Sequence, residues 1–284
     1  MAPMAFSDSG ASALLAVLQA PSDAPLPALP PTMVVAAHPG DETAGAGARL
    51  PRLADACFVC VTDGAPGDGE DASRHGYTPE EYAKARRLDL QTVLARCGIA
   101  PGRLSSLEAP DQQASLQLAP LARQLADRMT AFGAEIVLTQ PYEGVHPDRD
   151  ATAFVVHAAA ALLRSRGDSA PAIVEMASCQ CGADSIGFLP AHAGHGHAPV
   201  RVLLTPGEQR FKEDLLACFS TQEPAFRDFP VDAESFRVSP RYEFRAPPHR
   251  GTLHYENHPW GMRGERFRAL AAQALEELGL DGPL

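Results

Sequence analysis

The sequence predicts a three-layer α/β domain built on a mostly parallel sheet. Short apolar segments alternate with helical segments along most of the chain, and this alternation is typical of parallel sheets covered by helices on both faces. The chain has 284 residues, of which 45% are hydrophobic, enough for one large domain with a full core. We therefore expect one domain over residues 32–284, preceded by an N-terminal arm over residues 1–31 that is rich in Ala, Pro and Ser.

The first half of the chain supplies most of the expected strands. Apolar runs mark each strand, and the clearest helix starts after Thr78, a good capping residue followed by Pro79 and two acidic residues. Gly98 ends this helix. The expected strands are 33–37, 57–62, 104–108 and 135–139, and the expected helices are 10–19, 43–54, 79–97 and 113–131.

The second half continues the alternation and then becomes irregular. We expect helices at 150–165, 207–218 and 263–278, and strands at 172–177 and 200–204. Residues 221–262 are rich in Pro, Arg and aromatic residues and show no clear period. This segment is predicted to be an irregular C-terminal cover. Its aromatic and polar residues suit either packing over the sheet or the wall of a sugar-binding pocket.

Cysteine and histidine clusters favour structural roles over metal binding. Cys57 and Cys60 lie in an apolar run, and residues three apart on a strand point to opposite faces, so buried thiols are expected. Cys179 and Cys181 share one face of an expected strand and are interpreted as structural. The His-rich segment 192–197 is interpreted as a solvated loop, with metal capture as the alternative.

The charge balance argues against two classes of partner. Lys+Arg number 24 against Asp+Glu 35, a net charge of -11, which argues against nucleic acid or an anionic membrane as partner. No Lys or Arg precedes Arg49, so a secretory signal is not expected. No apolar run approaches the ~20 residues that span a bilayer. A cytoplasmic location is therefore predicted.

Two segments rich in metal-ligand residues follow expected strands. His38 and Asp41 come directly after the first core strand, and His146 and Asp148 come after the strand at 135–139. Ligands of open α/β sheets bind at the carboxyl ends of the strands, so these segments can meet in space. Histidine and aspartate are good zinc ligands.

A nucleotide-binding Rossmann domain is the weaker interpretation. Gly45 and Gly47 follow the first core strand, but they do not form G-x-G-x-x-G at the required turn.

The order of several short motifs is informative. The chain carries, in sequence, Ala37-His-Pro-Gly-Asp-Glu42, Thr62-Asp-Gly64, Arg86-Arg-Leu-Asp89, Pro110-Asp111 and Val145-His-Pro-Asp-Arg149. This order, and the strand or helix context of each motif, resembles the LmbE/PIG-L family of zinc-dependent N-acetylglucosamine deacetylases. The resemblance covers residues 33–165 and implies a Rossmann-like domain.

The resemblance also implies a site and a reaction. It makes His38 and Asp41 zinc ligands, His146 the residue that stabilises the oxyanion, and Asp148 the residue that orients His146. Arg86 then holds the substrate. The implied activity is zinc-assisted hydrolysis of the acetamide of an N-acetylglucosamine-type substrate, with a small-molecule amino sugar or glycoconjugate as partner.

Two positions depart from the family pattern. Gly40 stands where the family has its general base, a group typically worth ~10²–10⁴-fold in rate, and Arg149 stands where it has the third zinc ligand. Glu42 or Asp63 could replace the base. Alternatively, Arg149 pairs with Asp41 and binds substrate in a metal-free site. The chain would then be a catalytically impaired, carbohydrate-binding or regulatory relative.

Overall fold

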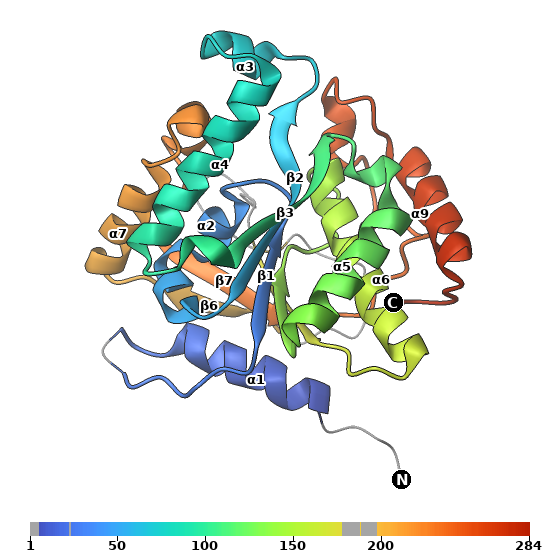
Figure 1. The fold of residues 1–284 in the computed structure, drawn as a ribbon, viewed down its shortest axis with the longest axis horizontal. Coiled ribbons are helices and arrows are strands. Elements are labelled where there is room, and N and C mark those ends of the chain that lie inside the picture. Colours follow the sequence, from blue (N-terminus) through green and yellow to red (C-terminus); the bar gives the residue numbers. More distant parts are fainter. Residues whose placement is uncertain (1–5, 23, 178–187, 189–197) are drawn as a thin grey trace.

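The computed structural model describes residues 6–22, 24–177, 188 and 198–284 (Figure 1). Its centre is a seven-stranded sheet with the order β3-β2-β1-β4-β5-β7-β6. Within the described chain only β7 runs against its neighbours, since it pairs antiparallel with both β5 and β6. The predicted α/β class with a mostly parallel sheet is confirmed. The strands are β1 (Thr32–Ala36), β2 (Cys57–Pro66), β3 (Leu104–Asp111), β4 (Ile136–Thr139), β5 (Ala172–Met176), β6 (Val200–Leu203) and β7 (Ala233–Val238).

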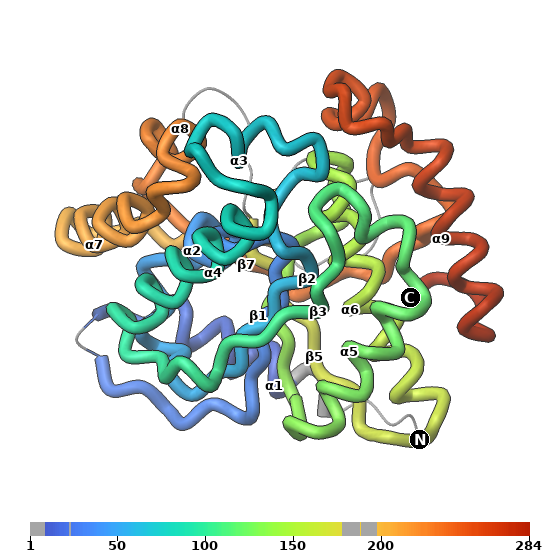
Figure 2. Tube along the Cα trace, turned by 45° about the horizontal axis from the view of Figure 1, so that its top comes forward, coloured from blue at the N-terminus to red at the C-terminus, as the bar shows by residue number. Residues whose placement is uncertain are grey.

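Helices cover both faces of the sheet, so the domain has three layers. In Figures 1 and 2, α5, α6 and α9 lie on one side of the sheet, and α2, α4 and α7 lie on the other. The helices are α1 (Phe6–Gln19), α2 (Asp41–Ala46), α3 (Glu70–Arg74), α4 (Pro79–Arg96), α5 (Leu118–Phe132), α6 (Pro147–Arg166), α7 (Pro206–Leu216), α8 (Glu223–Phe226) and α9 (Gly264–Leu278). Short 3-10 turns are η1 (Gly47–Leu53), η2 (Pro101–Arg103), η3 (Ala114–Leu116), η4 (Ser220–Gln222) and η5 (His254–Asn257).

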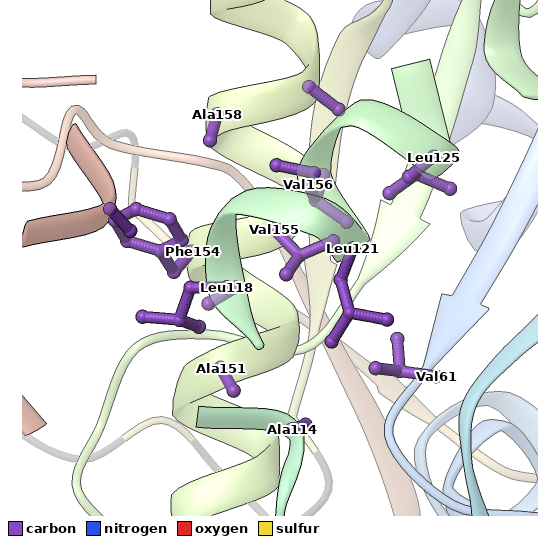
Figure 3. Packing of buried hydrophobic residues seen from close by; sticks show 14 of the residues in the cluster. Val61, Ala114, Leu118, Leu121, Leu125, Ala151, Phe154, Val155, Val156 and Ala158 are labelled. Carbon is purple, nitrogen blue, oxygen red and sulfur yellow. The ribbon is translucent and has the colours of Figure 1, made fainter. Parts of the chain in front are cut away.

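Two hydrophobic cores form because successive side chains of a strand face opposite sides. In β1, Val35 belongs to the core under α5, α6 and α9, whereas Val34 belongs to the core under α1 and α4. Figure 3 shows part of the first core: Leu125 of α5 lies on the side nearer the strands, whereas Phe154 of α6 points away from them, toward the C-terminal segment, and packs on Phe244. All five residues of β1 are buried. This strand is therefore rigidly held, and so is the start of the loop after it.

The predicted N-terminal arm contains a helix that packs on the sheet. Ala11, Leu14 and Leu18 of α1 are at most 1% exposed and belong to the same core as Val34. This part of residues 1–31 thus contributes to the core. The division into arm and domain remains a prediction.

Two elements differ from the sequence-based expectation. The helix expected at 43–54 is split into α2 and η1, because Ala46 leaves helical geometry (φ -141, ψ 20) and Pro51 lacks the N–H that an α-helix requires. The expected irregular segment 221–262 contains β7, which lies inside the sheet. Its buried polar residues, Glu234 and Arg237, hid the strand pattern. The name C-terminal cover is therefore kept for residues 239–262 alone.

The thiols of Cys57 and Cys60 are free and lie in different cores, one on each side of β2. The expected opposite orientation is confirmed. Cys179, Cys181 and the His-rich segment 192–197 lie outside the described residues. Among the helices that the structure describes, none combines the length and apolarity that a bilayer crossing requires.

Candidate active site

The loop after β1 is held in place by hydrogen bonds from two sides. Arg86 of α4 is buried and donates to the carbonyl oxygen of Pro39 at 2.6 Å and to that of Gly64 at 2.7 Å. Thr62 Oγ1 donates to the Ala37 carbonyl at 2.9 Å. Arg86 therefore ties the loops after β1 and β2 together. Its role in holding substrate, which the resemblance implies, stays a prediction.

His38 is the hub of the site. Its side chain is only 11% exposed, and its Nδ1 lies 3.0 Å from Asp41 Oδ2. Its Nε2 lies 3.2 Å from Asp148 Oδ2 and 3.5 Å from Asp111 Oδ2. Burial opposes the charged imidazole, but Asp111, Asp148 and Asp41 together hold the pKa of His38 well above its ordinary value. One ring thus joins three carboxylates.

The second motif, which contains His146 and Asp148, lies at the start of α6. This helix begins at Pro147, three residues earlier than the sequence predicted. His146 caps the helix: its Nδ1 accepts the backbone N–H of Asp148 at 3.2 Å. Asp148 is fully buried, and its oxygens also accept the N–H groups of Gln112 at 2.6 Å and Ala114 at 3.1 Å. The segment after β3 is thereby fixed to the start of α6.

Four side chains of metal-ligand type converge here. One ligand atom from each of His38, Asp111, His146 and Asp148 lies within 4.8 Å of the others. Asp111 was not among the predicted site residues, although Pro110-Asp111 is one of the ordered motifs and follows the strand expected at 104–108. Its backbone N–H is held by Asp63 Oδ1 at 3.0 Å.

Arg149 occupies the position that the sequence analysis considered for a third ligand. Its Nη2 lies 2.6 Å from Asp41 Oδ1, and a guanidinium has no lone pair for a metal. Burial would raise the pKa of Asp41, but Arg149 and His38 hold it well below its ordinary range. The predicted ion pair between Arg149 and Asp41 is therefore present.

Packing leaves little room for a side chain at Gly40, where the family has its general base. Gly40 has φ +111, a conformation that favours glycine, and a Cβ there would lie 3.1 Å from Cζ of Phe226. Glu42 is 1% exposed and accepts the Gly40 N–H at 3.1 Å and the Thr43 hydroxyl at 2.6 Å. Burial raises the pKa of Glu42 to about 7.

Aromatic rings of the C-terminal cover reach the site. Trp260, the only tryptophan in the chain, packs against His146 with ring centroids 4.5 Å apart. It also stacks on His258 at 4.2 Å, with 10° between the ring planes. The cover is anchored by His254, whose N–H donates to the Gly144 carbonyl at 2.8 Å. The cover thus packs over the loop that carries His146.

The geometry divides the predicted site residues into two groups. His38, Asp41, His146, Asp148 and Arg149 meet in one cluster, joined by Asp111. The other two, Arg86 and Glu42, are buried beside it and hold the loops of the cluster through backbone groups.

Comparison with known proteins agrees with the motif order. Residues 33–160 match the family model described as PIG-L, GlcNAc-PI de-N-acetylase. No match was found among curated proteins. Similar solved structures include the zinc-inhibited form of the teicoplanin deacetylase Orf2 (15% identity, TM-score 0.56), covering 73% of this chain and 97% of that one.

Two further structures support the same fold. The A40926 pseudoaglycone deacetylase Dbv21 is 17% identical with a TM-score of 0.54, over 73% of this chain and 96% of that chain. The N,N'-diacetylchitobiose deacetylase from Pyrococcus horikoshii is 18% identical with a TM-score of 0.51, over 83% and 93%. The family match confirms the resemblance drawn from the sequence over residues 33–160, which match the PIG-L (LmbE-like) family model, and the solved structures support the fold.

Proposed function

We propose that this protein hydrolyses the acetamide of an N-acetylglucosamine-type substrate with the help of a divalent metal. The observation that carries the proposal is the convergence of His38, Asp111, His146 and Asp148 inside a PIG-L domain. The imidazole of His38 and the carboxylates of Asp111 and Asp148 are suitable donors for zinc, and His146 lies beside them. Such an ion, when bound, supplies Lewis-acid polarisation of the amide carbonyl.

His146 is the proposed stabiliser of the developing oxyanion. Because its Nδ1 accepts the Asp148 N–H, the neutral ring carries its proton on Nε2, which can donate to a substrate oxygen. Burial and the neighbouring His38 hold the pKa of His146 well below its ordinary value. The ring therefore stays neutral and keeps this donor in place near neutral pH.

Glu42 is the proposed base that accepts a proton from the water attacking the amide, in place of the side chain that Gly40 lacks. A base works best when its pKa lies near the working pH, and burial raises that of Glu42 to about 7. Its carboxylate already contacts the Gly40 backbone. To reach a substrate it must release Gly40 or Thr43, so activity through Glu42 requires a local rotation.

A second candidate is a sugar-binding protein that does not hydrolyse. The Arg149–Asp41 ion pair favours this function, because it supplies positive charge beside His38 without a metal. Arg149 is then the residue that binds the polar groups of the sugar.

Acetate release from N-acetylglucosamine glycosides and N,N'-diacetylchitobiose, measured with and without added zinc, separates the two functions. A deacetylase releases acetate, and His146→Ala lowers the rate at least ~10²-fold. Asp214→Asn, an exposed carboxylate on α7, serves as the matched control and keeps the rate. Saturable binding of the same sugars by NMR, without acetate release by zinc-treated protein, refutes hydrolysis and supports the second candidate.

A further inference from the structure

We propose that this protein binds a divalent metal at the Nε2 edge of His38, with Asp111 and Asp148 as the carboxylate ligands. Arg149 takes the place beside Asp41 where the sequence motif implies the ion. This ligand set differs from the one that the motif implies. The proposal concerns metal binding alone, so it holds whether or not the protein hydrolyses amides.

The distances at the Nε2 edge suit a shared ion. Asp148 Oδ2 lies 3.2 Å and Asp111 Oδ2 lies 3.5 Å from His38 Nε2. Ligand atoms about 2.0–2.2 Å from a tetrahedral zinc are roughly 3.3–3.6 Å from one another. The two distances to Nε2 therefore match the spacing of ligands around one ion, and the ligand atoms of Asp111 and Asp148 lie within 4.8 Å of each other. The donor set of one imidazole and two carboxylates suits zinc or a similar transition metal.

The other edge of the ring is arranged as the support of a metal-binding histidine. His38 Nδ1 lies 3.0 Å from Asp41 Oδ2, and the same oxygen accepts the His38 backbone N–H at 3.0 Å. Histidines that bind metals usually donate their second ring N–H to a carboxylate, which fixes the tautomer. With its proton on Nδ1, His38 presents the lone pair of Nε2 to Asp111 and Asp148.

Arg149 makes the position beside Asp41 unsuitable for a metal ion. Its Nη2 is 2.6 Å from Asp41 Oδ1, so an ion bound by Asp41 would meet a fixed cation with no lone pair to offer. His146 is also unavailable as a ligand while its Nδ1 accepts the Asp148 N–H. It stays beside the ion as a hydrogen-bond donor.

The charges in direct contact also call for a divalent ion. Asp41, Asp111 and Asp148 are each at most 5% exposed, and buried carboxylates need cationic partners. Arg149 balances one of them. A divalent ion that displaces the Nε2 proton of His38 would balance the other two.

Zinc titration of metal-free protein, followed by calorimetry and elemental analysis, tests the ligand set. We expect about one zinc per wild-type chain. Asp111→Asn should weaken zinc binding by ~10²-fold or more, since a ligand is lost, whereas Asp41→Asn should weaken it by only ~10–100-fold as a supporting partner. Asp214→Asn is the control and binds as wild type. Zinc binding unchanged by Asp111→Asn, or no zinc bound by wild type, overturns the proposal.

Wild-type protein offers two further readouts that do not depend on a variant folding. Cobalt at His38 should quench the emission of Trp260, whose ring packs on His146, itself 4.7 Å from the His38 ring. Anomalous diffraction from zinc-soaked crystals should place the ion between His38, Asp111 and Asp148. A peak beside Asp41 with Arg149 displaced refutes the proposal. Bound zinc without acetate release leaves it intact and refutes only the hydrolase function.

Discussion

The ion pair between Arg149 and Asp41 leads to a quantitative prediction about stability. Arg149→Met keeps much of the side-chain volume but leaves the Asp41 carboxylate without its guanidinium. The side chain of Asp41 is 6% exposed and that of Arg149 is 24% exposed. Loss of one partner from a fully buried pair costs about 3–5 kcal/mol, whereas exposed pairs contribute about 0–1 kcal/mol. For this partly screened pair we expect a loss of about 2 kcal/mol in the free energy of unfolding.

Urea unfolding measures this loss. With a slope of about 3 kcal/mol per molar urea, the midpoint should fall by about 0.7 M at pH 7. Because the folded pKa of Asp41 lies below its ordinary 3.8, its stabilising contribution is present above that value and is lost as pH falls through the folded pKa. The difference between wild type and Arg149→Met should therefore shrink in acid.

A double-mutant cycle isolates the pair from the other contacts of Arg149. In an Asp41→Asn background, Arg149→Met should cost at least about 1 kcal/mol less than it does in wild type. If the cost is the same in both backgrounds, or lies below about 0.5 kcal/mol in wild type, the pair does not carry the charge balance inferred for it.

Three other changes probe the scaffold. Burial lowers the pKa of His157 to about 3, so on acidification the unfolded state binds a proton at His157 before the folded state does. The free energy of unfolding should therefore fall by ~1.4 kcal/mol per pH unit between about 6.5 and 3, and acid titration of His157→Gln should show a shallower slope. Lys212→Met leaves the fully buried Glu234 without its cation and should cost about 3–5 kcal/mol in urea, much of which a second change, Glu234→Leu, should recover. Gly144→Ala puts a Cβ 2.7 Å from a side chain of the C-terminal cover, whereas Gly76→Ala, at nearly the same φ, meets nothing within 4 Å; only the first should exceed about 1–2 kcal/mol in thermal unfolding.

The fold was predictable because most of its signals are local. The α4 start is one example: Thr78 caps the helix as expected, in a capping box with Glu81, and Pro79 opens the helix. Apolar runs also located the central strands, since a strand buried on both faces leaves no polar residue to interrupt the pattern. The strand β7 was not predicted. Its Glu234 is buried in a pair with Lys212, and its Arg237 is buried in a pair with Glu175. Such pairs join residues distant in sequence and leave no periodic signal.

The sequence predicted most residues of the cluster and the ion pair between Arg149 and Asp41, but not the place of Asp111 or the orientation of Glu42. Motif order brought His38, Asp41 and Asp148 into consideration, and the structure places them together. Asp111 carried a weaker signal, because a single aspartate after a proline is common and its importance comes from the register of β3 against β2. The orientation of Glu42 also depends on backbone N–H groups, which a sequence does not display.

The two departures from the family pattern are accommodated by contacts within the fold. Arg149 is paired with Asp41, and Phe226 fills the space beside Gly40, 3.1 Å from where a Cβ would lie. A site that had merely lost its residues would leave Asp41 without a cation and a gap beside Gly40. Restoring the family residues by Gly40→Asp and Arg149→His should therefore strain the loop, since φ is +111 at position 40.

The strain can be separated from the chemistry by adding Phe226→Ala to the two changes. We expect Gly40→Asp with Arg149→His to lower the thermal midpoint and to gain little acetate-releasing activity. With Phe226→Ala, the new carboxylate has room, and part of both losses should be recovered. The strained φ remains, so recovery stays incomplete. If the double variant alone is as stable as wild type and active, Phe226 does not constrain this position, and the packing around Gly40 is incidental to its chemistry.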